Sequence, residues 1–373
     1  MSELTPPRRR SLPHRIGRLA LPVTLFTLVY AGILIYSPLR LAHLMFPAWM
    51  PGQMILLALI VGPILGRVVY ELKPSVLARH LAALSLTWLG CAFLLWCLIV
   101  PYEALALSLA PDPRSAGVII AAVWSALCIV ALISAQRLEI AHLTLAAHSI
   151  PRALRLVQIS DVHIGSRAGS FLIRVVDRIL PLAPDVVMIT GDLVDFAAVP
   201  ESELATLARL RMPVFFCIGN HERYVDCDAI CERLERQGVR VLRECMDTSI
   251  PGVVVIGLDD AERRTRVREG LQSLGALPQG YRILLYHRPD GLEDAAAAGV
   301  DLMLCGHTHF GQMIPFNFLV RRVFPRIRGL YRVDPTRLYV SPGTGTWGPV
   351  MRLGSSNEIT CFDLEPAGAP TAA

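Results

Sequence analysis

The sequence predicts two regions of different kinds, an amino-terminal region of four transmembrane helices and a following α/β domain. Four long stretches contain no formally charged side chain, and they lie between residues 18 and 40, 40 and 67, 80 and 103, and 114 and 137. Each can cross a hydrocarbon core of about 30 Å at about 1.5 Å per helical residue. From residue 154 on, apolar β-branched runs alternate with helical windows, which is typical of layered α/β architecture.

Two further features favour membrane helices over the alternative, a buried helical bundle in a soluble protein. The mean hydropathy of the chain is +0.47. Aromatic residues that suit a membrane interface fall near the expected ends of the spans; they are Tyr36, Trp49, Trp88, Trp96 and Tyr102. We therefore expect a basic amino-terminal segment at 1–18 and four transmembrane helices within 19–136.

The basic residues between the spans predict the orientation. They gather before the first span, between the second and third, and after the fourth, whereas Arg40 and Arg114 lie in the two other loops. By the positive-inside rule, the amino terminus and the domain after the fourth span are cytoplasmic, in a multi-pass protein of the cell (inner) membrane. The run from Arg9 to Leu12 loosely resembles a twin-arginine export signal, but one cleavable signal would not explain three further spans.

Beyond the spans, residues 137–153 form a short apolar linker with the character of a strand or an interfacial segment, and 154–365 form the α/β domain. Helical windows are expected at about 170–182, 201–210, 227–236, 261–274 and 291–298. Strands are expected near 154–160, 185–190, 213–218, 252–257, 282–287, 301–305, 337–341 and 358–363. Residues 366–373 form a small-residue tail. The chain has nine cysteines without the paired spacing of a structural zinc site, and we interpret them as structural.

Five of the expected strands are followed directly by side chains that can bind a metal ion. These side chains are Asp161 and His163, then Asp192, Asn220, His287, and finally His307 with His309. Because ligands gather at the carboxyl ends of strands in an open α/β sheet, we expect the seven donors to converge. Any one of these motifs alone is as readily an ordinary turn or loop. All five together favour a site for first-row divalent cations, with Mn, Fe and Zn as candidates.

The order Asp-x-His, Gly-Asp, Gly-Asn-His-Glu, His, Gly-His-Thr-His resembles that of the calcineurin-like metallophosphoesterase superfamily. Gly-Asp-Leu-Val-Asp at 191–195, Gly-His-Thr-His-Phe-Gly-Gln at 306–312 and Ser-Pro-Gly-Thr-Gly at 341–345 are most similar to its bacterial membrane-associated branch. The resemblance covers about residues 150–365. It implies two facing mixed β-sheets flanked by helices, the metallophosphatase αββα sandwich.

The resemblance also implies how the donors divide between two metal ions. One ion would be held by Asp161, His163, Asp192 and His309, and the other by Asp192, Asn220, His287 and His307, so that Asp192 bridges them. In such a centre a hydroxide shared by the ions attacks phosphorus, and both cations neutralise charge on the phosphoryl oxygens.

Three residues beside the motifs are candidates for supporting roles. His221 follows the predicted ligand Asn220 and is the candidate catalytic residue that stabilises the transition state or protonates the leaving oxygen. The alternative is a histidine that only hydrogen-bonds its loop. Asp195 and Glu222 either orient ligand histidines or are solvated loop carboxylates.

A segment after the last motif mixes apolar residues with arginines, as does a segment at a lipid headgroup surface. Its candidate substrate-binding residues are Arg321, Arg322, Arg326 and Arg328, and an ordinary loop packed on the domain is the alternative.

Together these features predict a membrane-anchored phosphoesterase that cleaves a phosphodiester or pyrophosphate bond, with membrane lipids and no nucleic acid among its partners. Its substrate would be lipid-linked, such as a UDP-diacylglucosamine-type glycolipid handled in lipid metabolism. A general or nucleotide phosphodiesterase that the membrane only localises, and a signalling or scaffold protein with an inactive phosphatase domain, are the alternatives.

Overall fold

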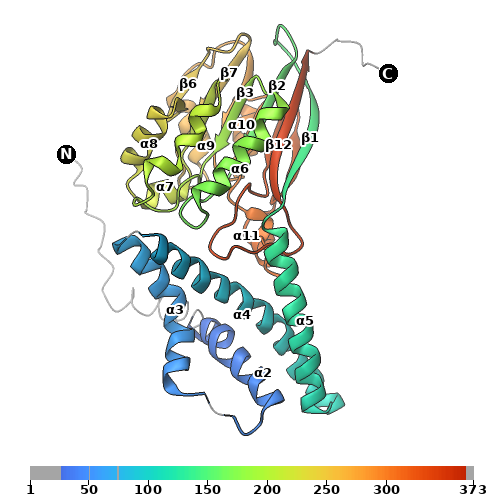
Figure 1. Ribbon diagram of the computed structural model, residues 1–373. Coiled ribbons are helices and arrows are strands. Elements are labelled where there is room, and N and C mark those ends of the chain that lie inside the picture. The colour runs from blue at the N-terminus through green and yellow to red at the C-terminus, as the bar shows by residue number, and fades with distance from the viewer. Residues whose placement is uncertain (1–26, 50, 74, 367–373) are drawn as a thin grey trace, which may run out of the picture. The chain divides into compact units, whose positions relative to one another are not determined.

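The computed structural model describes residues 27–49, 51–73 and 75–366 (Figure 1). The predicted basic segment 1–18 and, apart from Pro366, the predicted tail lie outside the described residues. By tertiary contacts the chain divides into two compact units, Met1–Ile64 with Trp88–Ala126, and Leu65–Thr87 with Leu127–Ala373.

Four helices among the described residues are long and apolar enough to cross a membrane, as the sequence predicts. The first covers Thr27–Met45 and contains the π-helical turn η1 (Gly32–Tyr36) and α2 (Ser37–Met45). The others are α3 (Gln53–Leu72), α4 (Val76–Leu109) and α5 (Pro113–Ser134). Within the first unit, Leu44, Leu95 and Ile99 are buried together, and Arg40 of α2 forms an ion pair with Glu103 of α4 at 2.6 Å.

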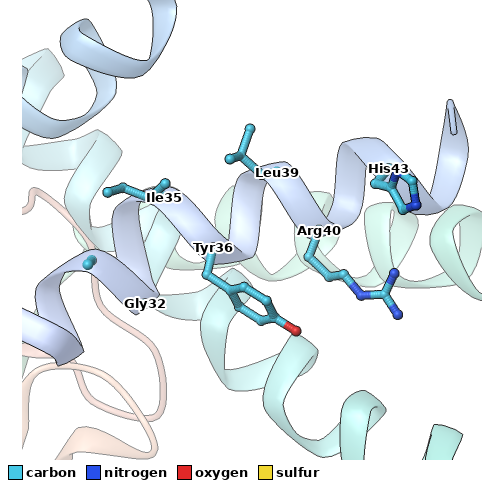
Figure 2. A pocket seen from close by; sticks show the side chains of 7 residues that line it. Gly32, Ile35, Tyr36, Leu39, Arg40 and His43 are labelled. Atoms are coloured by element: carbon cyan, nitrogen blue, oxygen red, sulfur yellow. The ribbon is translucent and has the colours of Figure 1, made fainter. Parts of the chain in front are cut away.

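A hollow of about 460 Å³ lies along the first of these helices (Figure 2). It is lined by Ala31, Gly32, Ile35, Tyr36, Leu39, Arg40 and His43. Most of its lining is apolar and comes from one face of a candidate span, so we expect lipid chains to fill it.

The second unit contains two six-stranded sheets. The first has the strand order β1-β12-β2-β3-β4-β5, and its strands are β1 (Leu138–Ala147), β2 (Leu154–Ile159), β3 (Val186–Thr190), β4 (Val214–Cys217), β5 (Val239–Val241) and β12 (Asn357–Pro366). Strands β2 to β5 run parallel, and β12 is antiparallel to β2. All five residues of β3 are buried, as expected of a central parallel strand.

The second sheet has the order β10-β11-β9-β8-β7-β6. Its strands are β6 (Cys245–Asp247), β7 (Val253–Gly257), β8 (Tyr281–Leu285), β9 (Leu302–Cys305), β10 (Gly329–Val333) and β11 (Thr336–Val340). Strands β7, β8, β9 and β11 are parallel, and the two edge strands are antiparallel to their neighbours. Both sheets are therefore mixed.

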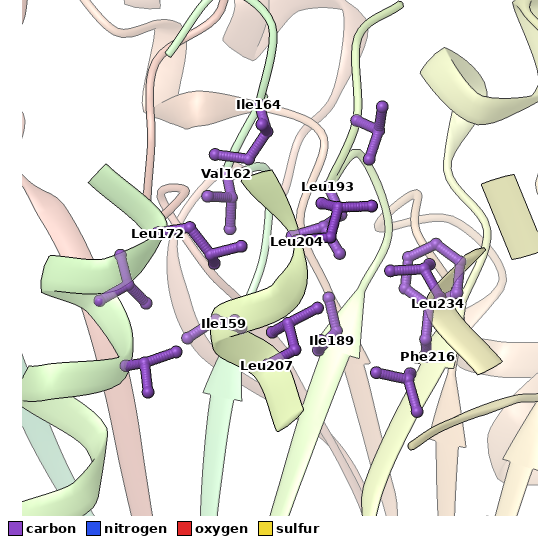
Figure 3. Packing of buried hydrophobic residues seen from close by; sticks show 14 of the residues in the cluster. Ile159, Val162, Ile164, Leu172, Ile189, Leu193, Leu204, Leu207, Phe216 and Leu234 are labelled. Atoms are coloured by element: carbon purple, nitrogen blue, oxygen red, sulfur yellow. The ribbon is translucent and has the colours of Figure 1, made fainter. Parts of the chain in front are cut away.

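The sheets face each other, because one apolar cluster takes residues from both; it includes Leu156, Met188, Phe215, Ile283 and Leu304. Helices α6 (Gly169–Ile179) and α8 (Cys227–Arg236) cover the outer face of the first sheet (Figures 1 and 3). Helices α9 (Arg266–Ser273) and α10 (Leu292–Ala297) cover the outer face of the second. The predicted αββα architecture is confirmed.

Helix α6 follows directly from its sequence. Phe171, Leu172, Val175, Val176 and Ile179 repeat at helical spacing and are all buried, while the residues between them are polar or exposed. Their stripe packs on Ile159, Ile189 and neighbouring residues of the first sheet (Figure 3).

The linker 137–153 contains strand β1, which fits the first of its two predicted characters and pairs in parallel with β12 from Leu138 opposite Asn357 to Ala147 opposite Pro366. Other elements differ from the expected ones. The window 201–210 consists of two 3₁₀ helices, η3 (Glu201–Glu203) and η4 (Ala205–Arg209). The arginine-rich segment begins with a helix, α11 (Phe316–Val323). Short helices α7 (Asn220–Tyr224), η2 (Leu180–Leu182) and η5 (His309–Gly311) lie within or next to loops.

Candidate metal centre

The donor side chains follow β2, β3 and β4 of the first sheet and β8 and β9 of the second, at the carboxyl end of each strand. Strands β2, β3 and β4 run parallel to one another, as do β8 and β9, and the sheets face each other. The seven side chains predicted as ligands therefore meet at one edge of the sandwich. Two groups of them, Asp161 with His163 and His309, and Asp192 with His287 and His307, each have ligand atoms within 4.8 Å of one another.

In the first group, the Nε2 atoms of His163 and His309 lie 2.9 Å apart, and Asp161 Oδ1 is 3.4 Å from His309 Nε2. His163 and Asp161 are fully buried, and His309 is nearly so. The Nδ1–H of His163 donates to Asp195 at 2.6 Å, so its Nε2 faces the group and can bind a cation once it has lost its proton.

In the second group, His287 is the central side chain. Its Nδ1–H donates to the Thr190 carbonyl at 2.8 Å. Its Nε2 faces Asp192 Oδ2 at 3.1 Å, Asn220 Oδ1 at 3.2 Å and His307 Nδ1 at 3.1 Å. Asn220 thus joins the group although the amide side chain carries no charge.

This donor set fits a cation. Around His287 Nε2, a carboxylate oxygen, an amide oxygen and a second imidazole nitrogen, all able to act as acceptors, lie within 3.2 Å. One proton can satisfy only one or two of these acceptors, whereas a divalent cation is shared by all of them. Mixed carboxylate, imidazole and amide donors suit first-row divalent ions.

The carboxylates strongly affect the imidazoles. Burial opposes protonation of His287, but Asp192 outweighs it and raises its pKa to about 10. Burial also opposes protonation of His163, where Asp195, Asp192 and Asp161 raise the pKa to about 9. Any cation that binds here must displace protons from these rings.

The backbone around the donors is held in an unusual conformation. Asp161, His163, Asp192, His307 and His309 all have φ between 49° and 71°, which L residues rarely adopt. Strain of this kind persists where surrounding structure over-determines it, and it clusters at functional sites. Gly306 shows why the motif contains glycine, because a Cβ there would collide with Ser160 Oγ and Asp161 Oδ2.

His221 lies beside the centre without a place in either of these two groups. Its Nδ1 contacts Asp195 Oδ1 at 2.8 Å, and its Nε2 is 4.0 Å from Asp192 Oδ2. Its ring also lies 6.2 Å from the ring of Trp347, whose side chain is half exposed. His221 therefore sits between the buried donors and the surface.

Asp195 and Glu222 are both buried, so neither is a solvated loop carboxylate. Asp195 accepts from His163 and His221 and thus orients histidines, the first of the two predicted alternatives. Glu222 contacts the backbone instead: it accepts the N–H groups of Asp192, Val194 and Gly219 at 2.8 to 3.0 Å. It ties the loop after β3 to the loop after β4.

Sequence reasoning missed Arg352, which is fully buried. Its guanidinium donates to the carbonyls of Pro342 at 2.8 Å and Gly345 at 2.6 Å and to Asn357 Oδ1 at 2.6 Å. Burial lowers its pKa to about 9. The chain is rich in arginine, and nothing in the sequence distinguishes Arg352 from the arginines that are exposed.

The four arginines of the predicted substrate-binding cluster are placed differently. Arg326 forms an ion pair with Glu293, and Arg328 pairs with Glu358 at 3.3 Å. Arg321 and Arg322 are exposed in the last turn of α11 and have no ion-pair partner among the described residues.

Two facing mixed sheets with aspartates and histidines at the strand ends define the class of the protein, the metallophosphatase-like α/β proteins. Residues 154–311 match the family model described as calcineurin-like phosphoesterase. The chain is 34% identical over 263 residues to a transmembrane protein with metallophosphoesterase domain from Danio rerio, covering 63% of this chain and 59% of that protein. It is 31% identical over 245 residues to an uncharacterized metallophosphoesterase from Aquifex aeolicus, covering 62% of this chain and 93% of that protein.

The chain therefore belongs to the calcineurin-like metallophosphoesterase family, which confirms the resemblance seen in the motifs. It spans about three fifths of the length of the Danio rerio relative. A solved structure of a putative 5'-nucleotidase from Staphylococcus aureus has a TM-score of 0.35 and 17% identity, over 59% of this chain and 56% of that one. A likeness that low adds nothing to the assignment.

Proposed function

We propose that this protein is a membrane-anchored phosphoesterase that uses two divalent cations to hydrolyse a phosphodiester or pyrophosphate bond in a lipid-linked substrate. The observation that carries the proposal is the convergence of Asp161, His163 and His309, and of Asp192, His287 and His307, at one edge of two facing sheets. When bound, the cations would supply the attacking nucleophile and neutralise charge on the phosphoryl oxygens.

The chain's own residues would position that chemistry. Asp195 and the Thr190 carbonyl fix the orientation of two donor rings through their Nδ1–H groups. Asp195 also contacts Nδ1 of His221 and so holds the orientation of that ring. With Nδ1–H donated to Asp195, the Nε2–H of that ring would face the leaving oxygen and protonate it.

A lipid-linked substrate is supported by the position of the centre. The connection between β3 and β4, which carries Asp195, and the loop that carries Arg352 also contact the ends of candidate membrane helices within the second unit. Arg79, in the first turns of α4, pairs with Glu203, and the Arg352 N–H donates to the carbonyl of Ala131 in α5 at 2.9 Å. The exposed Arg321 and Arg322 would offer forked donors to a phosphate headgroup.

A cytoplasmic domain is part of the proposal. The residues just before the α3–α4 turn and the end of α5 both contact the same domain, which is expected if two crossings separate them. A reporter fused after residue 373 tests this. Cytoplasmic fluorescence without periplasmic phosphatase activity is expected, and the reverse pattern would reject the orientation.

The enzyme assignment is tested on the full-length protein purified in detergent. Bound Mn, Fe and Zn are measured by mass spectrometry, and hydrolysis of bis(p-nitrophenyl) phosphate is followed. Asp192→Asn should lower both metal content and activity, whereas Asp177→Asn, an exposed carboxylate on α6 paired with Arg209, should lower neither. A wild-type protein that binds no transition ion and hydrolyses nothing would instead favour the inactive scaffold.

The substrate class is tested in cells. Lipid extracts of a strain that lacks the protein are compared with those of the parent strain. An accumulated phosphorylated lipid would support the lipid-linked substrate, and accumulation of a soluble nucleotide instead would favour the nucleotide phosphodiesterase.

A further inference from the structure

Helix α11 exposes a large apolar surface beside the candidate metal centre. Phe318, Leu319 and Val323 are each more than 60% exposed, and Phe316 and the preceding Ile314 more than 40%. Asn317 is buried on the opposite side of the helix. Contiguous apolar surface of this kind on one helix marks a contact with a partner or a membrane.

The end of a candidate membrane helix lies next to this surface. The N–H of Arg352 donates to the carbonyl of Ala131 in the last turns of α5. The next residue, Leu353, accepts from the N–H of Ile314 at 3.0 Å. Helix α11 begins at Phe316, two residues after Ile314. A short hydrogen-bonded path therefore connects α11 to the point where α5 leaves its apolar stretch.

We propose that α11 lies in the headgroup region of the bilayer, with Phe316, Phe318, Leu319 and Val323 inserted among the lipids and Arg321 and Arg322 facing lipid phosphates. An amphipathic helix with apolar residues and basic residues suits such an interface, and α5 ends beside it. The second unit would then contact the membrane through α11 as well as through the ends of its spans.

This placement has a consequence for the substrate, which rests on the proposed function. Phe324, directly after α11, packs edge-on against the ring of His307 with centroids 5.0 Å apart. Thr308, between the two histidines of the last motif, donates to the carbonyl of Ile327 at 2.7 Å. A lipid whose chains stay among the α11 side chains would thus have its phosphoester near the donor cluster without leaving the membrane.

Photocrosslinking tests the contact without any need for turnover. The full-length protein carries p-benzoyl-phenylalanine at position 318 and is placed in nanodiscs of equimolar phosphatidylcholine and phosphatidylglycerol. Position 130, half exposed in α5, is the lipid-facing control. Position 276 is the solvent control, because Ala276 is exposed before β8, at the sheet edge opposite the metal ligands.

Lipid adducts at 318 and 130 but not at 276 are the expected result. Leu319→Asp should reduce the adduct at 318 about tenfold, because a carboxylate resists insertion, and Ala276→Asp should not. Lipid adducts at position 130 alone would overturn the proposal. A covalent dimer formed through position 318 would also overturn it, because the surface would then contact a second copy of the chain. Because crosslinking needs no metal, an inactive enzyme that still gives lipid adducts would reject the proposed function and keep this contact.

Discussion

Replacing Asp195 with asparagine tests whether one buried carboxylate organises the centre. Both His163 and His221 contact the same atom, Oδ1, at 2.6 and 2.8 Å, while Oδ2 accepts the Ser166 N–H at 3.3 Å. Asparagine keeps the shape but cannot satisfy all three donors. With its carbonyl at the Oδ1 position, its NH₂ opposes the Ser166 N–H; with the amide flipped, its NH₂ opposes both imidazole N–H groups.

The size of the effect follows from the hydrogen bonds. A hydrogen bond to a charged group contributes about 1.5–3 kcal/mol and a neutral one about 0.5–1.5 kcal/mol. Each of the two imidazole bonds to position 195 therefore weakens by about 1–1.5 kcal/mol, and together they lose about 2–3 kcal/mol. At about 1.4 kcal/mol per factor of ten, kcat should fall about 30- to 140-fold, close to the range typical of residues that orient metal ligands. Asp177→Asn is the matched control.

The loss should persist across neutral pH. Burial opposes ionisation of Asp195, but His163 and His221 outweigh it and hold the pKa of Asp195 below its usual range. A carboxylate with a depressed pKa contributes its charge above that pKa and loses it only as the pH falls through it, so the wild type stays ionised at neutral pH. The assay is kcat on bis(p-nitrophenyl) phosphate with saturating Mn²⁺, together with metal content. Full wild-type kcat in Asp195→Asn would refute the reasoning.

Four further changes test other parts of the centre. His221→Ala should lower kcat about 100-fold while metal content measured by mass spectrometry stays near wild type, and unaltered turnover would remove His221 from the reaction. Because the carboxylates raise the pKa of His287 to about 10, protons compete with the cation, so calorimetry should give weaker Mn²⁺ binding at about pH 6 than at about pH 8; equal affinities would contradict this. Gly306→Ala should lower the melting temperature and the metal content, since its Cβ collides with Asp161, and a variant as stable and as metal-rich as wild type would show that the loop can move aside. Replacing Arg321 and Arg322 by Gln should lower the ratio of activity on a bilayer phosphodiester to activity on the soluble one. Arg211→Gln, which changes an exposed arginine just before β4, should not; equal losses on both substrates would count against headgroup binding.

The positions of the predicted metal ligands could be anticipated because the place where each strand ends follows from local pattern. Runs such as Val186–Thr190 are short, apolar and β-branched, and a polar residue directly after each one must leave at a strand end. Once the strands are parallel, the ends meet at one edge. Packing then brings the two sheets together. The alternation of strands and helices along the sequence could not show this by itself.

Other features depend on distant contacts and escaped the sequence. Strands β5 and β6 have three residues each, too few for a period of two to be visible. The sequence predicts a strand or an interfacial segment within 137–153, but the place of β1 in the sheet is set by pairing with β12, more than 200 residues away. Asp195 could be noted as a neighbour of the motifs, but its contact with two histidines from different loops is tertiary. Arg352 is recognisable only by its burial.

The end of α3 contacts the loop of Asp195, and this contact supports a further prediction. Phe196, adjacent to Asp195, is 3% exposed, and its ring packs edge-on against Tyr70 of α3 with centroids 5.2 Å apart. The guanidinium of Arg67 lies 5.0 Å from the centre of the same ring. The end of α3 therefore covers the loop that holds the carboxylate in place.

Removing the ring at position 70 should loosen that loop and lower kcat. An edge-on aromatic pair contributes about 0.5–1.5 kcal/mol, so Tyr70→Ala should lower kcat by about 2- to 10-fold, and Tyr70→Phe, which keeps the ring, should not. Thermal unfolding of both variants separates this effect from loss of folded protein. If the ring acts through Asp195, Tyr70→Ala adds little to an enzyme that already carries Asp195→Asn, because the hydrogen bonds it supports are gone. Fully additive losses in the double variant would mean that Tyr70 affects the reaction by another route.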